Sequence, residues 1–277
     1  MKIIFFGLVV SCVFLLTACQ KEAGFSNGSG SGTGSGDLLT KLVSKSGSDS
    51  SSISFGYNAA KKLTTLDFFT LSNGQSAEIN ERAERNSQGI IQRVIIKSDV
   101  YQQAGVDSAI TVVGYNGGKY TSKVTSFDLV VIVLKDSVAL AYDAAGKVSS
   151  ERSFTDVGGA YEEYQKVEYT YSGNNLASIK YYSYDASTPG YTLVETFTYD
   201  QYDSKASPIY FGYEAFVLGS PFFFSSNNPL KSTITATGST AQNYTTTYTY
   251  NAANKPLTAT SIIQPGNAIT TGTYYYQ

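Results

Sequence analysis

The sequence contains no histidine, no tryptophan and only two cysteines among its 277 residues. The missing histidine excludes Ser-His-Asp and Cys-His catalysis, histidine-ligated zinc and imidazole acid–base chemistry. Charged residues make up only 15% of the chain, and the formal net charge of −2 is too balanced for a nucleic-acid binder. The low charge also excludes an acidic disordered tail. Several classes of function are therefore removed before any motif is considered.

Tyrosine, phenylalanine and threonine take the place of the missing residue types. The chain has 23 Tyr and 15 Phe, and apolar residues make up 42% of it. Aromatic and β-branched side chains fit the half-buried surface of a pleated sheet. Because the apolar content is enough for one large domain with its own core, the composition predicts an all-β protein.

The first twenty residues predict a bacterial lipoprotein signal. Lys2 provides the positive charge, and residues 3–16 form an apolar run of about 14 residues, which is short for a membrane span and typical of a signal peptide. Leu16-Thr17-Ala18-Cys19 at its end resembles a lipobox. We therefore predict a signal peptide over residues 1–18 and lipidation of Cys19. The alternative is an ordinary signal peptide in which the cysteine is incidental.

The segment 19–37 is predicted to be a tether, because it is rich in Gly and Ser and such segments are flexible. Since Cys12 lies in the removed signal, the mature chain cannot form an internal disulfide. Several acyl chains on Cys19 would make the membrane a stable partner. Gln20 is not the Asp that retains lipoproteins in the inner membrane, so we expect an outer-membrane lipoprotein that faces the periplasm or the cell surface.

A repeat of about 28 residues runs through residues 38–277, which we predict to be a single domain. Each copy has an anchor residue, usually aromatic, then Asn, Asp or Ser, then small residues with Gly or Asn, then an aliphatic residue. This order is typical of a hairpin, in which the anchor ends one strand and the aliphatic residue opens the next. Successive anchors are 25 to 30 residues apart, and they are Tyr57, Arg85, Tyr115, Tyr142, Tyr171, Tyr199, Phe224 and Tyr250.

Two strands per repeat predict about sixteen antiparallel strands in an up-and-down meander, either a strongly curved sheet or a barrel. Residues 134–138 are expected to form a second, more variable turn, and residues 127–134 a strand that is buried on both faces. The anchors should stack in a row along one rim, with Tyr276 at an edge of the sheet. Hairpin turns are predicted near residues 58–62, 116–119, 143–147, 172–175 and 251–255.

Two resemblances follow from these segments. The Tyr-Asp/Asn-Gly hairpin resembles the YD repeats of Rhs-type bacterial proteins, although the period here is longer. Leu38-Leu39-Thr40-Lys41-Leu42, Tyr202-Asp203-Ser204-Lys205 and Ser226-Asn227-Asn228, together with the lipobox, resemble an uncharacterised Bacteroidota lipoprotein family, a domain of unknown function with a porin-like fold. Ser207 departs from the Asn expected before Pro208. The resemblance implies an extensive porin-like sheet and no catalytic residues.

Charges within the strands argue against a barrel wall that faces lipid. A lipid-facing strand needs an apolar face about 25 Å tall. Residues 77–84 (AEINERAE) and 161–168 (YEEYQKVE) place charges where one face would meet lipid. Faces rich in Thr and Ser are also poor lipid contacts, so we predict a soluble porin-like domain.

Candidate sites are few, and each has an ordinary structural alternative. Glu162 and Glu163 are strand neighbours that point to opposite faces, so we expect a solvated strand end rather than an acid–base pair. Asp200 and Asp203 flank a predicted turn, but the oxygen series of a calcium loop is absent. No catalytic, cofactor or metal site is therefore predicted.

Two further features concern the surface. Ser108 and Ser137 stand in Asp-Ser-aliphatic triplets, which match an O-glycosylation pattern of this bacterial group. Aromatic runs at residues 181–182, 222–224 and 274–276 put rings on both faces of their strands. We interpret these rings as core and cross-strand pairs, with a carbohydrate platform as the alternative, against which the absence of Trp counts.

The sequence thus predicts a lipid-anchored, non-enzymatic envelope protein with a binding or scaffolding β-repeat domain, whose partner is a glycan or another envelope protein and not nucleic acid. The alternative is a glycan-acting enzyme that uses carboxylates alone, which needs two carboxylates facing one cleft roughly 5–10 Å apart. A shell of the Rhs type ranks last, because it needs a much longer array of repeats.

Overall fold

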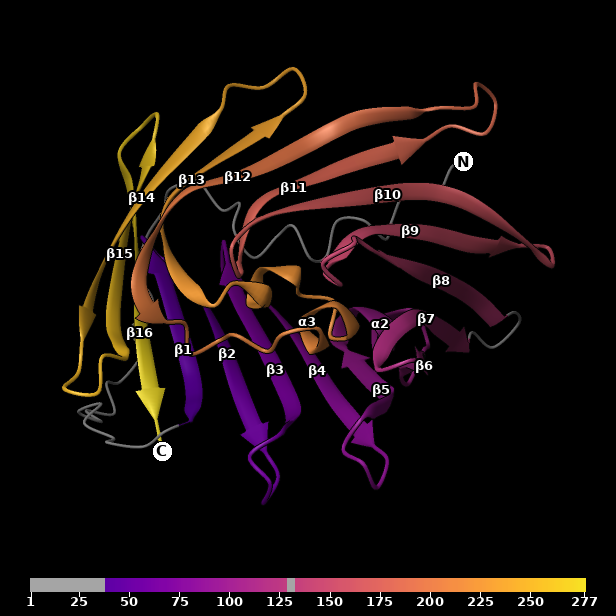
Figure 1. Ribbon diagram of the computed structural model, residues 1–277, viewed down its shortest axis with the longest axis horizontal. Coiled ribbons are helices and arrows are strands. Elements are labelled where there is room, and N and C mark those ends of the chain that lie inside the picture. Colours follow the sequence, from indigo (N-terminus) through magenta and orange to yellow (C-terminus); the bar gives the residue numbers. More distant parts are fainter. Residues whose placement is uncertain (1–37, 129–132) are drawn as a thin grey trace.

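A computed structural model describes residues 38–128 and 133–277. Sixteen antiparallel strands form a closed barrel in which each strand pairs with its neighbours in sequence and β1 pairs with β16 (Figure 1). The predicted signal peptide, Cys19 and the tether lie outside the described residues. The strands are β1 Leu39–Ser46, β2 Asp49–Tyr57, β3 Leu63–Ser72, β4 Gln75–Arg85, β5 Ile91–Ser98, β6 Ala109–Asn116, β7 Lys119–Asp128, β8 Val133–Tyr142, β9 Val148–Val157, β10 Ala160–Ser172, β11 Asn175–Tyr184, β12 Tyr191–Ala206, β13 Asn227–Ala236, β14 Gln242–Tyr250, β15 Pro256–Gln264 and β16 Ala268–Tyr276.

The all-β, sixteen-stranded antiparallel meander is confirmed, and the sheet closes into a barrel. The five predicted hairpin turns are also confirmed, because each falls between the end of one strand and the start of the next. Their local chemistry is the predicted one. The Asn58 side chain accepts hydrogen bonds from the backbone N–H groups of Ala60 and Lys62, each at 3.0 Å, and Asn251 does the same in the last hairpin. An Asn or Asp at this position therefore sets the turn.

A β-bulge lies next to the anchor in most hairpins at this rim. The register shifts between Gly56 and Tyr57, and the same shift occurs before Arg85, Tyr142 and Tyr171. A bulge inserts an extra residue into one strand, so the residue that opens the return strand and the third residue after it both face inward. Buried openers follow from this geometry, and they are Leu39, Leu63, Ile91, Tyr120, Val148, Leu176 and Pro256.

Tyrosine hydroxyls join neighbouring repeats around this rim. A tyrosine at or near the end of an even-numbered strand donates a hydrogen bond to a carbonyl oxygen near the start of an odd-numbered strand in the repeat before it. We call these bonds the tyrosine latches. They are Tyr57 to Leu39 (2.9 Å), Tyr142 to Tyr120 (2.5 Å), Tyr171 to Val148 (2.6 Å), Tyr202 to Leu176 (2.8 Å), Tyr248 to Pro229 (3.2 Å) and Tyr276 to Pro256 (2.8 Å).

Residues 207–226, between β12 and β13, do not form a hairpin turn. They fold into the barrel beneath the latched rim as a short helix α3 (Glu214–Val217) and a 3-10 helix η1 (Pro221–Phe224), and we call this segment the plug (Figure 1). Its aromatic rings pack on rings of the wall: Phe216 lies 5.0 Å from Tyr169 and Phe224 lies 5.2 Å from Tyr171, measured between ring centroids. The plug therefore completes the hydrophobic core inside the barrel.

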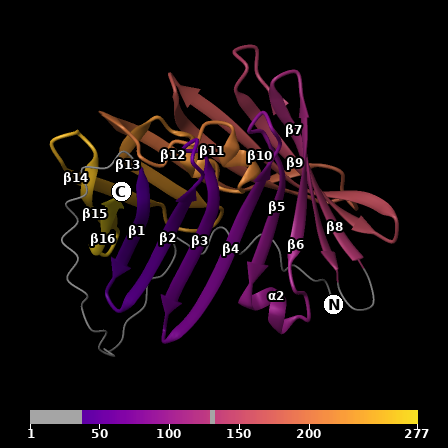
Figure 2. The ribbon, with the colours of Figure 1, turned by 90° about the horizontal axis from the view of Figure 1, so that it is seen from below.

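The opposite rim carries a second short helix, α2 (Asp99–Gln103), between β5 and β6 (Figure 2). Ser98 caps it by accepting a hydrogen bond from the Val100 backbone N–H at 3.2 Å. The Tyr101 ring packs edge-on against Phe127, 5.5 Å away. Among the described residues, no helix is long and apolar enough to cross a bilayer.

The structure corrects the predicted turn at residues 134–138 and the predicted strand at residues 127–134. Residues 134–138 lie inside β8. Phe127 in β7 lies opposite Leu134 in the adjacent antiparallel strand β8. Residues predicted to form one strand therefore belong to two paired strands. An uninterrupted apolar run does not distinguish one buried strand from the ends of two paired strands.

Two anchor assignments and the predicted edge position of Tyr276 are also wrong. Phe224 belongs to η1 in the plug, and with it the run 222–224 is not a strand. Tyr199 lies inside β12, and Tyr202, beyond a series of register shifts, makes the latch instead. Tyr276 is not at an edge, because β16 pairs with β1 and its hydroxyl latches to Pro256.

Candidate functional site

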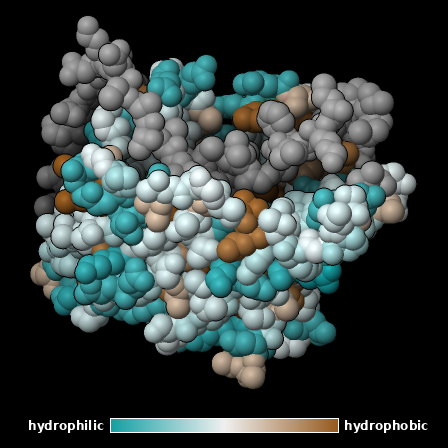
Figure 3. All heavy atoms as spheres, turned by 90° about the horizontal axis from the view of Figure 1, so that it is seen from above, coloured by the Kyte–Doolittle hydropathy of each residue, from teal (hydrophilic) through white to brown (hydrophobic). Residues whose placement is uncertain are grey.

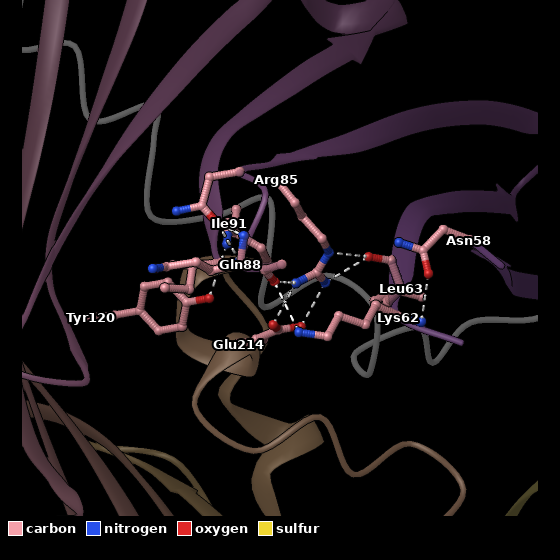
Figure 4. Close-up of polar contacts among 11 residues, drawn as sticks. Asn58, Lys62, Leu63, Arg85, Gln88, Ile91, Tyr120 and Glu214 are labelled. Atoms are coloured by element: carbon pink, nitrogen blue, oxygen red, sulfur yellow. Dashed lines mark hydrogen bonds and ion pairs between the residues drawn. The ribbon is translucent and has the colours of Figure 1, made fainter. Parts of the chain in front are cut away.

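The strongest polar contact between the barrel and its plug involves Arg85, at the position where other repeats carry a latching tyrosine. Its guanidinium donates to both carboxylate oxygens of Glu214 in the plug, at 2.6 and 2.7 Å, and to the carbonyl oxygen of Leu63, at 2.7 and 3.1 Å (Figure 4). The Arg85 side chain is only 6% exposed. One residue therefore closes the rim and also fastens the plug.

A second polar contact with the plug lies deeper in the barrel. The Lys123 ammonium donates to the carbonyl oxygen of Phe216 at 2.7 Å and lies 3.9 Å from a carboxylate oxygen of Glu151. The Tyr169 hydroxyl donates to the other Glu151 oxygen at 2.8 Å. Burial, together with the Glu151 charge, raises the pKa of Tyr169 well above its usual value. Lys123 and Glu151 are therefore held in fixed positions under the plug.

The positions of Lys123 and Glu151 are informative because of the repeat. Each is the third residue after a buried strand opener, a place that is apolar in other repeats, as with Leu66 and Ile179. Arg85 likewise replaces the latching tyrosine. All three departures from the repeat are charged, and Arg85 and Lys123 bond directly to the plug. The repeat is thus broken where the plug is held.

Beyond the plug, two further carboxyl groups face the barrel interior. In the part of the chain that the structure describes, Oε2 of Glu81 is the buried side-chain oxygen without a hydrogen-bond partner. Burial raises the pKa of Glu81 to about 8, partly offset by the charge of Lys123. Burial also raises the pKa of Asp136, while a hydrogen bond from Thr155 opposes that shift. At these two positions the interior thus favours the neutral form of the carboxyl group.

A shallow pocket of about 290 Å³ lies beside the Arg85–Glu214 pair, between the latched rim and the plug. Leu39, Tyr57 and Lys62 line it from the barrel, and Tyr210 and Glu214 line it from the plug. Ligand pockets for small molecules span roughly 300–1,000 Å³. The pocket is therefore at the lower limit of that range.

The outer wall has the opposite character from the interior. Along β14, exposed residues alternate with partly buried ones, so that Thr245, Thr247 and Thr249 face outward while Tyr244 and Tyr248 face inward. Figure 3, a view onto the side that lies uppermost in Figure 1, shows mostly white and teal atoms with scattered brown ones. Threonines of adjacent strands bond to each other here, as Thr249 does with Thr258 at 2.7 Å. The outward face of β14 is therefore rich in hydroxyl groups, while apolar side chains such as Val112 and Ile269 are exposed singly on other strands.

An aromatic and charged cluster lies on the outer wall over β9 to β12. The Tyr191 ring lies 6.4 Å from that of Tyr182 and 5.2 Å from that of Tyr184, and the Lys166 ammonium lies 4.1 Å from the Tyr191 ring centroid. Arg152 makes two hydrogen bonds with Glu163, whose oxygen also accepts the Tyr191 hydroxyl at 2.6 Å. We call this cluster the tyrosine patch, and its residues are Arg152, Glu163, Lys166, Tyr182, Tyr184 and Tyr191.

The acidic residues singled out in the sequence differ in part from what was expected. Glu162 is exposed, as expected, whereas the Glu163 side chain is only 8% exposed. Asp200 and Asp203 lie within β12 and do not flank a turn. The Asp203 carboxylate accepts hydrogen bonds from four donors, on Lys205, Asn228 and Tyr250. No group of His, Cys, Asp or Glu suited to a metal ion occurs among residues 38–128 and 133–277.

The two predicted modification sites lie apart from the plug. Ser108 is in the connection between α2 and β6 and is partly exposed. Ser137 is in β8, next to the inward-facing Asp136. Sequence reasoning missed the charged residues that hold the plug. The available signal was their departure from the repeat, since Lys123 and Glu151 stand where other copies have aliphatic residues.

Two solved structures show that the fold of this chain is porin-like. No protein-family description and no curated protein matches this sequence. A solved porin-like protein from Bacteroides uniformis is similar over 86% of this chain and 98% of its own, with a TM-score of 0.54 and 11% identity. A porin-like protein from Bacteroides vulgatus is similar over 87% and 99%, with a TM-score of 0.52 and 12% identity. A DUF3836 family protein from Bacteroides vulgatus matches 31% of this chain, with a TM-score of 0.27. At such identities the likeness establishes a porin-like fold alone.

Proposed function

We propose that this chain is a lipid-anchored protein of the outer membrane whose barrel stands in water and serves as a non-enzymatic binding scaffold rather than as a pore. The observation that carries the proposal is the distribution of polarity across the barrel wall. A membrane-spanning barrel has an apolar outer band and a polar, often water-filled interior. In this barrel the outward face of β14 carries threonines, exposed apolar residues on other strands are scattered, and the interior holds a hydrophobic core and the plug.

The plug supports the same proposal. It fills the barrel under the latched rim with aromatic rings, and the bidentate Arg85–Glu214 pair fastens it. Breaking a buried ion pair costs roughly 3–5 kcal/mol, so the plug is a fixed part of the core. The inward-facing Glu151 is bound by Tyr169 and Lys123, which is consistent with a structural role rather than with acid–base catalysis.

The envelope location rests on the sequence and on the fold together. Leu16-Thr17-Ala18-Cys19 resembles a lipobox, and the porin-like proteins to which this barrel is similar come from Bacteroides. A lipid anchor is needed only if the barrel itself does not insert into the bilayer. The polar outer wall and the lipid anchor therefore support the same location, in which the barrel lies outside the bilayer and the lipid attaches it.

Detergent partition and conductance test the proposal. We expect the full-length wild-type protein to fractionate with membranes through acylated Cys19. We expect a Cys19→Ala variant to partition into the aqueous phase of a Triton X-114 separation. Neither protein should produce channels in planar lipid bilayers. Retention of the Cys19→Ala variant in the detergent phase, or stepwise conductance, would show that the barrel wall inserts into lipid.

A further inference from the structure

We propose that the tyrosine patch binds a neutral polysaccharide, an inference that rests on the proposed function of the outer wall as a binding surface. The patch spans four adjacent strands, β9 to β12, which corresponds to about 15 Å at the usual strand spacing. That is the span of a short stretch of a sugar chain. The chemistry of the patch fits such a ligand in three respects.

The first respect is the aromatic surface. Tyr191, in β12, is 38% exposed. Tyr161, which lies two residues from Glu163 on the same face of β10, is 49% exposed. Tyrosine offers a rigid, amphipathic ring whose ordering costs little conformational entropy on binding. Sugar rings have an apolar C–H face that packs on such a ring and hydroxyl groups around the edge. Exposed tyrosines with polar groups beside them therefore mark a place where both parts of a sugar can be satisfied.

The second respect is preorganisation. Glu163 lies beneath the patch, with its side chain 8% exposed, and it fixes both the Arg152 guanidinium and the Tyr191 hydroxyl. The hydrogen bonds from Arg152 hold the pKa of Glu163 below its usual value, so the carboxylate stays charged at neutral pH. A surface whose rings and donors are already ordered loses less entropy when a ligand binds.

The third respect is charge. Arg152 is paired with Glu163, and Lys166 is paired with Glu168 at 2.9 Å, so the cations next to the rings are neutralised. An anionic polymer gains affinity mainly from cations that are not already compensated. Sugar hydroxyls, which both donate and accept hydrogen bonds, can use the paired donors and carboxylates together. A neutral polysaccharide is therefore favoured over an anionic one.

Affinity electrophoresis in native gels tests this proposal with the full-length protein in mild detergent. The probes are dextran, yeast mannan, galactomannan and hydroxyethylcellulose, with heparin as the anionic probe. We expect at least one neutral polysaccharide to retard the wild-type protein. We expect Tyr191→Ala to weaken that binding at least tenfold, whereas Tyr191→Phe, which keeps the ring, should weaken it less than threefold.

Tyr115→Ala is the matched control, because Tyr115 is 41% exposed and packs against one other tyrosine, Tyr120, away from the patch. It should bind like the wild type. Thermal unfolding of each variant verifies that the barrel is intact. The proposal is overturned if no neutral polysaccharide retards the wild type, if heparin alone does, or if Tyr191→Ala binds as tightly as Tyr115→Ala. Partition and conductance involve no sugar, so failure here is distinguishable from failure of the proposed function.

Discussion

Neighbouring hairpins at the rim are joined in two ways, by a tyrosine hydroxyl or by the Arg85 guanidinium. The first kind of contact recurs around the barrel, whereas the second is specific to the plug. Where a tyrosine hydroxyl makes the contact, as at Tyr171, it binds the carbonyl of the preceding repeat and closes the ring. Where Arg85 makes the contact, the same carbonyl position is satisfied by a guanidinium that also holds Glu214 of the plug. In a chain built of repeats, the residues that break the repeat therefore identify the contacts that are unique to this molecule.

The largest expected effect concerns the specialised contact. Arg85→Met should lower the free energy of unfolding by about 3–5 kcal/mol, because it leaves the Glu214 carboxylate without its partner and the Leu63 carbonyl without a donor. Urea unfolding followed by tyrosine fluorescence measures this loss. The control is Arg93→Met, whose ion pair with Glu84 is 41% and 39% exposed and should be worth less than about 1 kcal/mol. Equal losses in the two variants would mean that Arg85 does not fasten the plug.

The next effect concerns an ordinary latch. Tyr171→Ala should cost about 3 kcal/mol, because it removes a ring packed on Phe224 together with the hydroxyl bond to Val148. Tyr171→Phe isolates the hydroxyl and should cost about 1–2 kcal/mol, since it leaves a carbonyl without its donor. Tyr115→Ala, at an exposed anchor, should cost less than about 0.5 kcal/mol. Equal urea midpoints for Tyr171→Ala and Tyr115→Ala would show that the latching tyrosine does not stabilise the contact between repeats, and that the repeat only specifies the hairpin turns.

The sequence predicts the strands and hairpins well, because each repeat carries its own turn chemistry, with Asn58 and Asn251 bonding to the same relative backbone groups. The sequence left open whether the curved sheet closes into a barrel, since the pairing of Leu39 with Tyr276 joins the two ends of the described chain and has no local signal. The plug was missed because its phenylalanines resemble a strand in one-dimensional periodicity.

The contacts of the tyrosine patch were also not predictable from the local sequence. Glu163 was expected to be solvated, but Tyr191, which is 28 residues further along the chain, covers it. The latching residue also differs from the predicted anchor in two repeats. Tyr202 latches in place of Tyr199, because bulges in β12 move the register, and Tyr248 latches in place of Tyr250. Long-range contacts and bulges are set by packing, which the residue pattern of one strand does not contain.

Closure of the barrel gives a prediction of its own. In an open sheet Tyr276 would have neighbours on one side only, and its loss would be mild. In the closed barrel its hydroxyl binds Pro256 at 2.8 Å and its strand pairs with β1. Tyr276→Ala should therefore destabilise the protein nearly as much as Tyr171→Ala, by about 3 kcal/mol. A loss below about 1 kcal/mol in urea unfolding would indicate that the ends of the chain separate easily.

The smallest effect contrasts the inner and outer faces of the wall through pH. Burial raises the pKa of Glu81 to about 8, so the folded state holds a proton that the unfolded state releases near pH 4.5. Stability then falls as the pH rises from about 5 to 8, because the folded state binds more protons over that interval. Glu81→Gln should match the wild type near pH 5 and exceed its free energy of unfolding at pH 9 by about 1–3 kcal/mol.

On the outer face, the pH dependence that Glu163 contributes to stability has the opposite sign, since the pKa of Glu163 is lowered. Its contribution is present at neutral pH and is lost as the pH falls through the lowered pKa, so Glu163→Gln should be less stable than the wild type at pH 7, with a difference that shrinks in acid. Urea midpoints for both variants across this pH range measure the two slopes. If the Glu81→Gln curve runs parallel to that of the wild type, the interior does not favour a neutral carboxyl group at this position.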